Sequence, residues 1–456
     1  MNIKLWHNIQ RYIAIFLVYL LIILPVNAFI IGETILNAAV YKSTDIISSP
    51  NPVGSGARAI GMGGAFIAVA DDATAASWNP AGLIQLEEPE ISIVGAYTNT
   101  RICYNVAEHA ESNNTNNFKD SNLNYFSVAH PFHFYRNFVI SLNYQRLFEF
   151  KNNHSYWKKT DSASLSDTYY RQNGYLGALG FAAAVEITPY LSFGGTLNIW
   201  TDELFWKNKW YNSSSSYDKI THGNMLIESY SHIKKQHSSF KGVNLNLGLM
   251  WNISSHLTMG AVLKTPFTAS AHGEYSFTSQ TVITFLGNHA NTDTYESMAQ
   301  NSIKIRMPLS YGIGLAWRFS DIFTIGMDIY RTEWSQFMLR DEDGIEYFID
   351  GSDKSRSDVK NTIQVHLGSE YLFISKKSSI VIPVRAGLFY DQAPAHRHVT
   401  DFFGIATGAG ITYKEFVFDV AYQIRWSNNI DTGSLIGGSR ADKQSHTLLT
   451  SIIIHF

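Results

Sequence analysis

The chain of 456 residues contains a single cysteine, Cys103. One thiol cannot form an internal disulfide, and a cysteine-rich zinc site is excluded for the same reason. Charged side chains are also scarce, at 16 % of the sequence against about a quarter in an average soluble protein. The 35 basic and 38 acidic residues leave a net charge of −3, and no basic excess points to nucleic acid. So little charge favours a protein whose outer surface partly faces lipid.

A long apolar run is absent everywhere except at the N-terminus. Lys4 and Arg11 precede the apolar stretch 12–24, and small residues follow it at Ala28. This pattern predicts a signal peptide over residues 1–28, removed on secretion. A membrane anchor is the alternative, but the run is shorter than the roughly 20 residues that a spanning helix needs.

Motifs of enzymes are missing as well. The sequence has no Gly-x-Ser-x-Gly elbow, no paired histidines readable on a helix, and no Walker lysine after its glycine-rich stretch. A hydrolase would need a nucleophile, a base and an orienting group close together. We therefore expect neither catalysis nor a cofactor or a metal site.

From Pro89 onward, apolar and polar residues alternate with a period of two, which is typical of strands. The expected strands centre near Val94, Phe126, Ile140, Leu179, Leu197, Leu247, Leu263, Gly312, Met327, Leu367, Ala386, Gly408, Val420 and Ile452. These are about fourteen strands, and bacterial single-chain barrels require an even number. The prediction is an all-β membrane protein, with an antiparallel transmembrane β-barrel over residues 89–456.

The links between these strands alternate in length. Short links are expected near 132–136, 188–190, 252–255, 319–321, 375–378 and 413–415, and long polar loops at 107–121, 151–172, 206–238, 274–301, 338–360, 392–401 and 427–443. Outer-membrane barrels have short periplasmic turns and long extracellular loops. The terminal strand ending in Phe456 is similar to the assembly signal of such barrels.

Strand alternation also predicts which side chains face lipid. The strand 416–426 has Phe418 and Tyr422 on one face and Asp419 on the other. A charge facing lipid at mid-depth costs about 2–4 kcal/mol, so charged residues should point into the lumen. The expected lumen set is Lys304, Arg306, Asp328, His366, Glu370, Arg385, Asp419 and Arg425. Its cations, Lys304, Arg306, Arg385 and Arg425, are candidates either for binding a carboxylate of a substrate or for internal salt bridges.

Residues 29–88 lack strand alternation. They contain a short helical pattern, the glycine-rich stretch 54–64, an alanine-rich stretch, and then Asn79-Pro80-Ala81. Such a segment in front of a barrel predicts a partly helical hatch inside the lumen. Glycine permits close packing of the hatch backbone against the wall, and Pro80 forces Asn79 out of helical geometry.

The stretch 56–83 resembles the hatch signature of FadL-type long-chain fatty-acid and toluene transporters of the outer membrane. Segments 260–267 and 328–334 are similar to weaker motifs of that family. The resemblance implies an apolar lumen site beside the hatch, with the substrate leaving sideways through a gap in the wall near the Asn-Pro-Ala motif. The residues that match the hatch are Gly61, Gly63, Gly64, Asp71, Asp72, Asn79, Pro80 and Ala81.

The resulting hypothesis is an outer-membrane channel for passive uptake of long-chain fatty acids or similar hydrophobic compounds, such as aromatic hydrocarbons. The hatch would gate the lumen, and release would be lateral. The alternative is a non-transporting barrel that acts as a scaffold or a protein-secretion partner. We expect contact with outer-membrane lipid, and a monomer, because a closed barrel has no free sheet edge.

Overall fold

The computed structural model describes residues 53–106, 110–133, 136–161, 164–204, 206–348, 359–375, 377–394, 399–431 and 439–456. The predicted signal peptide, 1–28, and the first part of the predicted hatch, 29–52, lie outside these described residues. Within them, no helix is long and apolar enough to cross a membrane.

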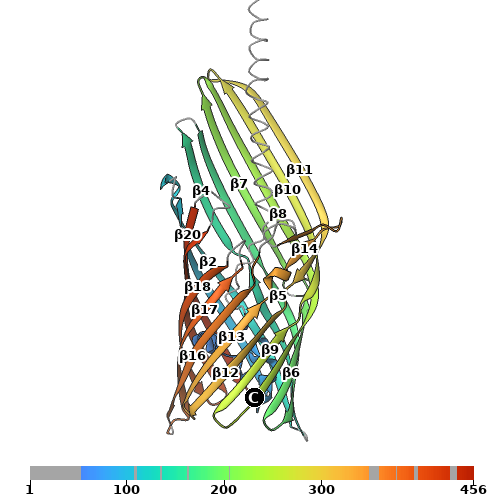
Figure 1. Cartoon of the computed structure of the whole chain (residues 1–456), viewed down its shortest axis with the longest axis vertical. Coiled ribbons are helices and arrows are strands. Elements are labelled where there is room, and N and C mark those ends of the chain that lie inside the picture. Colours follow the sequence, from blue (N-terminus) through green and yellow to red (C-terminus); the bar gives the residue numbers. More distant parts are fainter. Residues whose placement is uncertain are drawn as a thin grey trace, which may run out of the picture.

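One antiparallel sheet closes on itself to form a barrel (Figure 1). Closure occurs because β1 (Glu90–Val106) pairs with β2 (Asn114–His133) on one side and with β20 (Ser439–His455) on the other. The remaining uninterrupted strands are β5 (Ser164–Thr188), β8 (Met225–Asn252), β16 (Thr362–Ser375), β17 (Ile380–Ala393), β18 (Thr400–Tyr413) and β19 (Phe416–Asp431).

Five further wall strands are interrupted along their length. They are β3 (Asn137–Glu149) with β4 (Asn152–Asp161), β6 (Leu191–Trp200) with β7 (Lys209–His222), β9 (Leu257–Lys264) with β10 (Phe267–Phe285), β11 (Asn288–Met307) with β12 (Ser310–Ser320), and β13 (Phe323–Thr332) with β14 (Met338–Arg340). A short β15 (Glu346–Phe348) pairs only with β14. With each interrupted strand taken as one, the wall has fourteen strands, which confirms the prediction. Each expected centre lies within one of them.

The outer half of the molecule differs from the expectation. The segments 151–172, 206–238 and 274–301 are largely long β-hairpins rather than loops, and they rise well above the rest of the barrel (Figure 1). Their Ser-, Thr- and Asn-rich sequences resemble loops because both faces of the strands are polar. The continuous ladder from β4 across β5, β7 and β8 to β10 and β11 nevertheless forms strands, since backbone hydrogen bonds do not depend on side-chain polarity.

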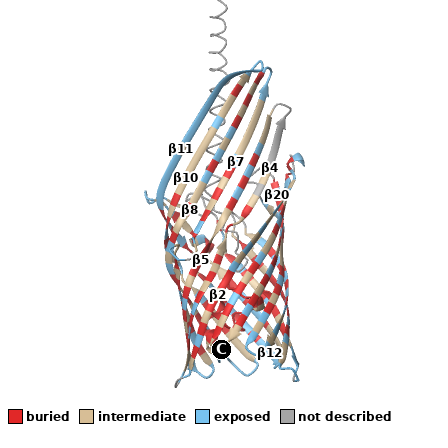
Figure 2. Ribbon diagram, turned by 180° about the vertical axis from the view of Figure 1, so that it is seen from behind, coloured by how far each residue is buried: buried red, intermediate tan, exposed pale blue. Residues whose placement is uncertain are grey.

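Exposed apolar side chains surround the lower barrel. They include Ile93, Ile140, Leu142, Phe181, Leu197, Leu249, Ile313, Leu315, Met327, Ile329, Leu367, Leu388, Ile405, Phe418, Leu448 and Ile452. Along each strand they alternate with buried residues, as the alternating colours of the lower strands show (Figure 2). An apolar belt around a closed barrel is the surface that faces lipid.

The described part of the hatch fills the lower lumen. It consists of α3 (Ala57–Gly61), α4 (Ala75–Trp78) and the 3₁₀ helix η2 (Pro80–Gln85), with most of its side chains buried. The wall facing it carries glycines at Gly194, Gly248, Gly260, Gly314, Gly326, Gly368 and Gly387. A Cβ atom added at Gly387 would lie 2.3 Å from the backbone nitrogen of Gly63. The wall glycines therefore allow direct contact between wall and hatch backbones.

Replacing Gly387→Val is expected to displace the hatch, because the new side chain would overlap its backbone. Overpacking of this kind costs about 1–3 kcal/mol. The barrel ladder should still close, since valine suits a strand. Liposome-swelling assays should then show faster entry of small sugars than for the wild type. Gly195→Val is the matched control, because its nearest neighbouring atom would lie at 3.7 Å. Equal swelling rates for both variants would contradict the close packing.

Candidate functional site

A chain of buried ion pairs fastens the hatch to the wall. Arg58 of α3 donates from Nε to Glu370 Oε2 of β16 at 3.0 Å and from Nη2 to Glu370 Oε1 at 2.9 Å. Arg58 also pairs with Asp71 of the hatch. On the wall side, Arg385 Nε lies 2.6 Å from Glu370 Oε2, and Arg385 Nη1 lies 2.5 Å from Asp419 Oδ1. Two arginines and three carboxylates thus form a connected set of ion pairs where hatch and wall meet.

Two more side chains bind the hatch backbone. Asp328 of β13 accepts hydrogen bonds from the amides of Phe66 and Ile67, at 2.6 and 2.8 Å. Asn79 donates from Nδ2 to the carbonyl of Ile67 at 2.8 Å and to the carbonyl of Leu249 in β8 at 3.1 Å. Asn79 therefore links the hatch to the wall with a single amide group.

The Asn-Pro-Ala motif does not lie beside an opening. Pro80 and Ala81 pack against Gly194 of β6, and Asn79 and Pro80 pack against Gly248 of β8. The ladder between β6 and β8 is unbroken from Leu191–Trp251 to Trp200–Gly242. The position beside a wall gap that the resemblance implied for this motif is therefore not observed.

The other predicted hatch residues shape the hatch itself. Gly63 and Gly64 adopt φ angles of +65° and +82°, in the left-handed region that favours glycine. Gly61 packs against Gly408 of β18. The backbone amide of Thr74 donates to Asp72 Oδ1 at 2.8 Å, which caps the turn into α4. None of the hatch residues proposed from the sequence lines the cavity described below.

Arg385 and Arg425 lie in the lumen, as the strand alternation predicted. Arg385 forms the ion pairs with Glu370 and Asp419 described above. Arg425 Nη2 lies 2.8 Å from Asp391 Oδ2, and its guanidinium carbon is 3.6 Å from the centre of the Phe402 ring. Both cations therefore already have internal partners.

The lumen position expected for Lys304 and Arg306 is wrong, because both side chains are exposed on the outside of the wall. Their neighbours Ile303 and Ile305 point inward instead and join a buried aromatic cluster. The strand is interrupted at Pro308, between β11 and β12, and the buried face changes there from odd-numbered to even-numbered residues. Proline lacks the amide that a ladder needs, so the alternation need not continue across it.

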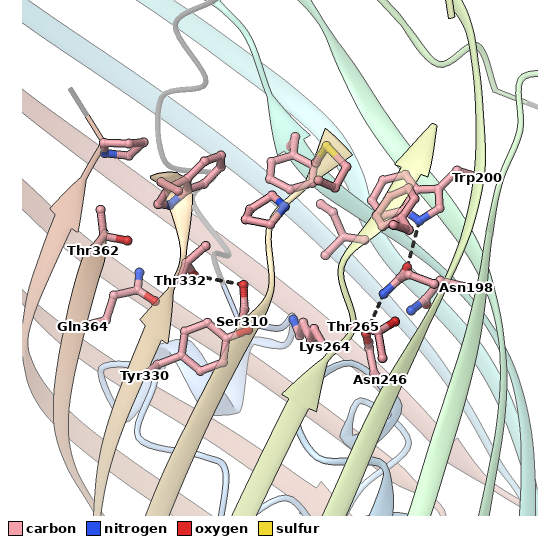
Figure 3. A pocket seen from close by; sticks show the side chains of 18 of the residues that line it. Asn198, Trp200, Asn246, Lys264, Thr265, Ser310, Tyr330, Thr332, Thr362 and Gln364 are labelled. Atoms are coloured by element: carbon pink, nitrogen blue, oxygen red, sulfur yellow. Dashed lines mark hydrogen bonds between the residues drawn. The ribbon is translucent and has the colours of Figure 1, made fainter. Parts of the chain in front are cut away.

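A cavity of about 90 Å³ lies in the lumen above the hatch, at the level where several wall strands are interrupted. Its apolar walls come from Leu147, Phe148, Trp200, Phe267, Met307, Pro308, Trp334 and Pro394. Its polar lining includes Asn198, Asn244, Asn246, Lys264, Ser310, Tyr330 and Gln364, and in Figure 3 Lys264, Tyr330 and Gln364 lie below Trp200. The cavity thus combines an aromatic upper part with a polar floor.

Lys264 is a cavity-lining cation that the sequence reasoning missed. Its ammonium group donates to the carbonyl of Val53 in the hatch and lies 5.9 Å from the centre of the Tyr330 ring. In contrast to Arg58, Arg385 and Arg425, it forms no ion pair with any carboxylate in the described part of the chain. It ends β9 within the segment 260–267, so a search of that segment for inward cations could have found it.

The polar side chains around Lys264 are partly satisfied by one another. Trp200 donates from Nε1 to Asn244 Oδ1 at 2.9 Å, and Asn244 Nδ2 donates to Asn246 Oδ1 at 3.1 Å (Figure 3). These bonds fix the indole of Trp200 over the floor. A ligand in the cavity would therefore meet a rigid aromatic wall and an ammonium group that is bonded to a carbonyl group.

A seam opens in the wall between β2 and β3. Their last paired residues are Tyr125 and Gln145; above them β2 pairs only with β1, and the end of β3 pairs only with β5. Side chains cross the seam instead of backbone bonds: Asp120 of β2 lies 3.3 Å from Lys151 Nζ and 3.5 Å from Arg146 Nη2. Because Leu147 and Phe148 of the same strand line the cavity, β3 borders both the cavity and the seam.

No cluster of three or more potential metal ligands occurs in the part of the chain that the structure describes.

Comparisons with known proteins agree with this architecture. The model of the family described as "Outer membrane protein transport protein (OMPP1/FadL/TodX)" matches residues 51–431. A FadL homologue of Pseudomonas aeruginosa has a TM-score of 0.59 and 14 % identity, covering 90 % of this chain and 99 % of that chain. The toluene transporter TodX of Pseudomonas putida has a TM-score of 0.54 and 13 % identity, covering 91 % and 100 %.

The toluene transporter TbuX of Ralstonia pickettii is similar as well, with a TM-score of 0.53 and 14 % identity over 89 % of this chain and 99 % of that chain. At such low identity these structures show a shared fold. No curated protein sequence matches the chain. The family match covers most of the sequence. The members of this family are transport proteins of the outer membrane, which agrees with the expectation that the chain is not an enzyme. The chain therefore belongs to the FadL/TodX family of outer-membrane transport proteins.

Proposed function

We propose that this transporter takes up long-chain fatty acids and related amphiphiles by passive diffusion, and that the carboxylate binds at Lys264. The observation that carries the proposal is an ammonium group without a carboxylate partner at the floor of an apolar cavity. An apolar chain would pack against Trp200 and Phe267, and the carboxylate would form a charge-assisted hydrogen bond. The proposal involves no energy source, because a binding site with a downhill gradient is sufficient.

Replacing Lys264→Met is expected to weaken oleate binding by about 10- to 100-fold, because a hydrogen bond to a charged group contributes about 1.5–3 kcal/mol. Binding of methyl oleate, which has no charge, should change less than about threefold. Tryptophan fluorescence of the purified barrel, which has Trp200 in the cavity wall, would report both titrations.

Lys414→Met, in the exposed turn between β18 and β19, is the matched control for loss of one positive charge. Equal weakening of oleate and methyl oleate would show that Lys264 shapes the cavity and does not bind the carboxylate. Toluene, which has no charge, should bind equally well to the wild type and to Lys264→Met. If the wild type binds toluene more tightly than oleate, the proposed substrate would be an aromatic hydrocarbon and not a fatty acid.

The hatch would act as the gate of the lumen, held shut by the ion pairs of Arg58 with Asp71 and Glu370. Replacing Glu370→Gln leaves the buried guanidinium group of Arg385 and the half-buried one of Arg58 without their shared carboxylate. Removing one partner of a buried pair costs about 3–5 kcal/mol. We expect amide hydrogen exchange in residues 57–71 to accelerate by at least about 100-fold, as measured by mass spectrometry.

The control is Glu415→Gln, which removes an exposed carboxylate at a turn. Unchanged protection of residues 57–71 in Glu370→Gln would show that the glycine contacts hold the hatch without the ion pairs. In neither variant should amide hydrogen exchange in the barrel strands become slower than in the wild type.

Release would be lateral, through the seam between β2 and β3. The support is that β3 lines the cavity with Leu147 and Phe148 and borders the seam with Arg146. Among the described residues, this part of the wall is crossed by the ion pairs of Asp120 and by hydrogen bonds from Asn114 Nδ2 of β2 to the carbonyl and the hydroxyl of Ser155 in β4, at 2.8 and 2.9 Å. These side-chain contacts separate more readily than a strand ladder. The route would lead a hydrophobic compound directly from the cavity toward the lipid-facing surface.

Closing the seam covalently tests this route. Asp120→Cys and Lys151→Cys, in a Cys103→Ser background, can be joined by a short bismaleimide because the native side chains approach to 3.3 Å. Cross-linking should abolish oleate uptake by cells while oleate still binds to the purified protein. The same cells without the reagent serve as the control. Undiminished uptake after complete cross-linking would point to exit past the hatch.

The scaffold or secretion-partner role remains the second candidate, and one observation favours it. The outer hairpins of β4–β5, β7–β8 and β10–β11 form an ordered sheet far above the lipid-facing belt (Figure 1). Uptake of labelled oleate into cells that lack their own transporter separates the two functions. Saturable uptake supports transport, whereas a folded barrel without uptake of any hydrophobic compound supports the scaffold role.

A further inference from the structure

The cations that turned out to face outward are not scattered. The strand register places Lys241 of β8 opposite Ser270 of β10, Ser270 opposite Lys304 of β11, and Lys304 opposite Arg340 of β14. Neighbouring strands lie about 4.8 Å apart, so this row brings three cations within roughly 15 Å of one another. Arg306 lies two residues from Lys304 on the same exposed face of β11. We call Lys241, Lys304, Arg306 and Arg340 the cationic row.

The cationic row lies at the outer edge of the lipid-facing belt. On β8, the next outward residue below Lys241 is Val243, which is 54 % exposed. On the strand formed by β11 and β12, the outward residues below Arg306 and Pro308 are Tyr311 and Ile313, which belong to the belt. The tall polar hairpins rise on the other side of the row (Figure 1). A lipid packed against the belt would therefore have its head group at the level of these cations.

The wall around the row is hollowed. The hollow is lined by Ser239, Lys241, Ser270, Ala271, His272, Ser302, Ile303, Lys304, Arg340, Asp341, Glu342 and Gly344. Glu342 Oε1 accepts a hydrogen bond from the amide of Ser302 at 2.5 Å. The hollow is thus lined by hydroxyl groups, by the cations Lys241, Lys304 and Arg340, and by the carboxylates Asp341 and Glu342.

The charges of the row are only partly neutralised by the protein. Lys241 pairs with Glu203, and Arg340 pairs with Glu346, yet their side chains remain 45 % and 55 % exposed. Lys304 and Arg306 form no ion pair with a carboxylate of the described residues. Two adjacent exposed cations without partners are unfavourable by themselves, because like charges repel. They become favourable if an external anion lies between them.

We propose that the cationic row binds the phosphate groups of lipid in the outer leaflet, as a site on the outer wall separate from the transport path. Phosphate accepts several charge-assisted hydrogen bonds at once, and arginine matches its geometry. The acyl chains of the same lipid would contact the belt below, so the site is continuous with the lipid-facing surface. The lipid would fix the height of the barrel in the membrane at the side where the tall hairpins rise.

The test uses the purified full-length protein in an uncharged detergent, with EDTA to exclude bridging by divalent cations. Binding is titrated by native mass spectrometry with three probes: lipid A carrying two phosphates, the same lipid after removal of both phosphates, and inorganic phosphate. The wild type should bind the phosphorylated lipid at least tenfold more tightly than either of the others. The variant Lys304→Gln with Arg306→Gln should bind it about 30-fold more weakly, at roughly fivefold for each surface cation removed.

The control variant is Lys219→Gln with Lys234→Gln, which removes two cations from β7 and β8 higher on the hairpins. It should retain wild-type affinity, and both variants should show the same heat-induced mobility shift of a folded barrel. Equal affinity for phosphorylated and dephosphorylated lipid would overturn the proposal. So would equal weakening in the control variant, or binding of inorganic phosphate as tight as that of the lipid, which would make the hollow a site for free anions.

Discussion

Closure of the backbone ladder is the constraint on which the rest of the structure depends. Inside lipid, every amide and carbonyl must be bonded within the protein, and the pairing of β1 with β20 removes the last free edge. Interruptions of the ladder occur at Pro266 and Pro308 and between β2 and β3, where side chains line the cavity or cross the seam. The departures from the regular barrel therefore coincide with the places where a ligand could bind or pass.

The lumen cations divide into two groups according to whether the protein neutralises them. Arg58, Arg385 and Arg425 are paired with carboxylates; the pair of Arg58 with Glu370 holds the hatch to the wall, and the pairs of Arg385 and Arg425 join wall strands to one another. Lys264 has only a carbonyl group and an aromatic ring as partners. A paired buried cation has little left to offer a ligand, whereas an unpaired one gains from an incoming carboxylate. Lys304 and Arg306 also form no ion pair with a carboxylate of the described residues, but they lie on the outside of the wall and are not lumen cations.

Sequence reasoning failed where it assumed that the same alternation of lipid-facing and lumen-facing residues holds along a whole strand. The apolar residues Ile303 and Ile305 resemble lipid-facing residues, but above the belt the outer surface meets water and the inner surface packs against aromatic rings. The cost of an outward charge therefore disappears, and Lys304 can face outward. The sequences of the polar hairpins resemble loops for a related reason, since neither of their faces needs to be apolar outside the membrane.

The sequence by itself determined the number of wall strands, the presence of a glycine-rich hatch and the lipid-facing belt, because these follow from local periodicity and composition. Only the tertiary structure decided which charges meet. Arg58 and Glu370 are 312 positions apart, and Lys264 meets the carbonyl of Val53 across 211 positions. Such contacts depend on the closure and register of the whole barrel. A local pattern cannot contain that information, because the face that a side chain takes can change where a strand is interrupted, as it does between β11 and β12.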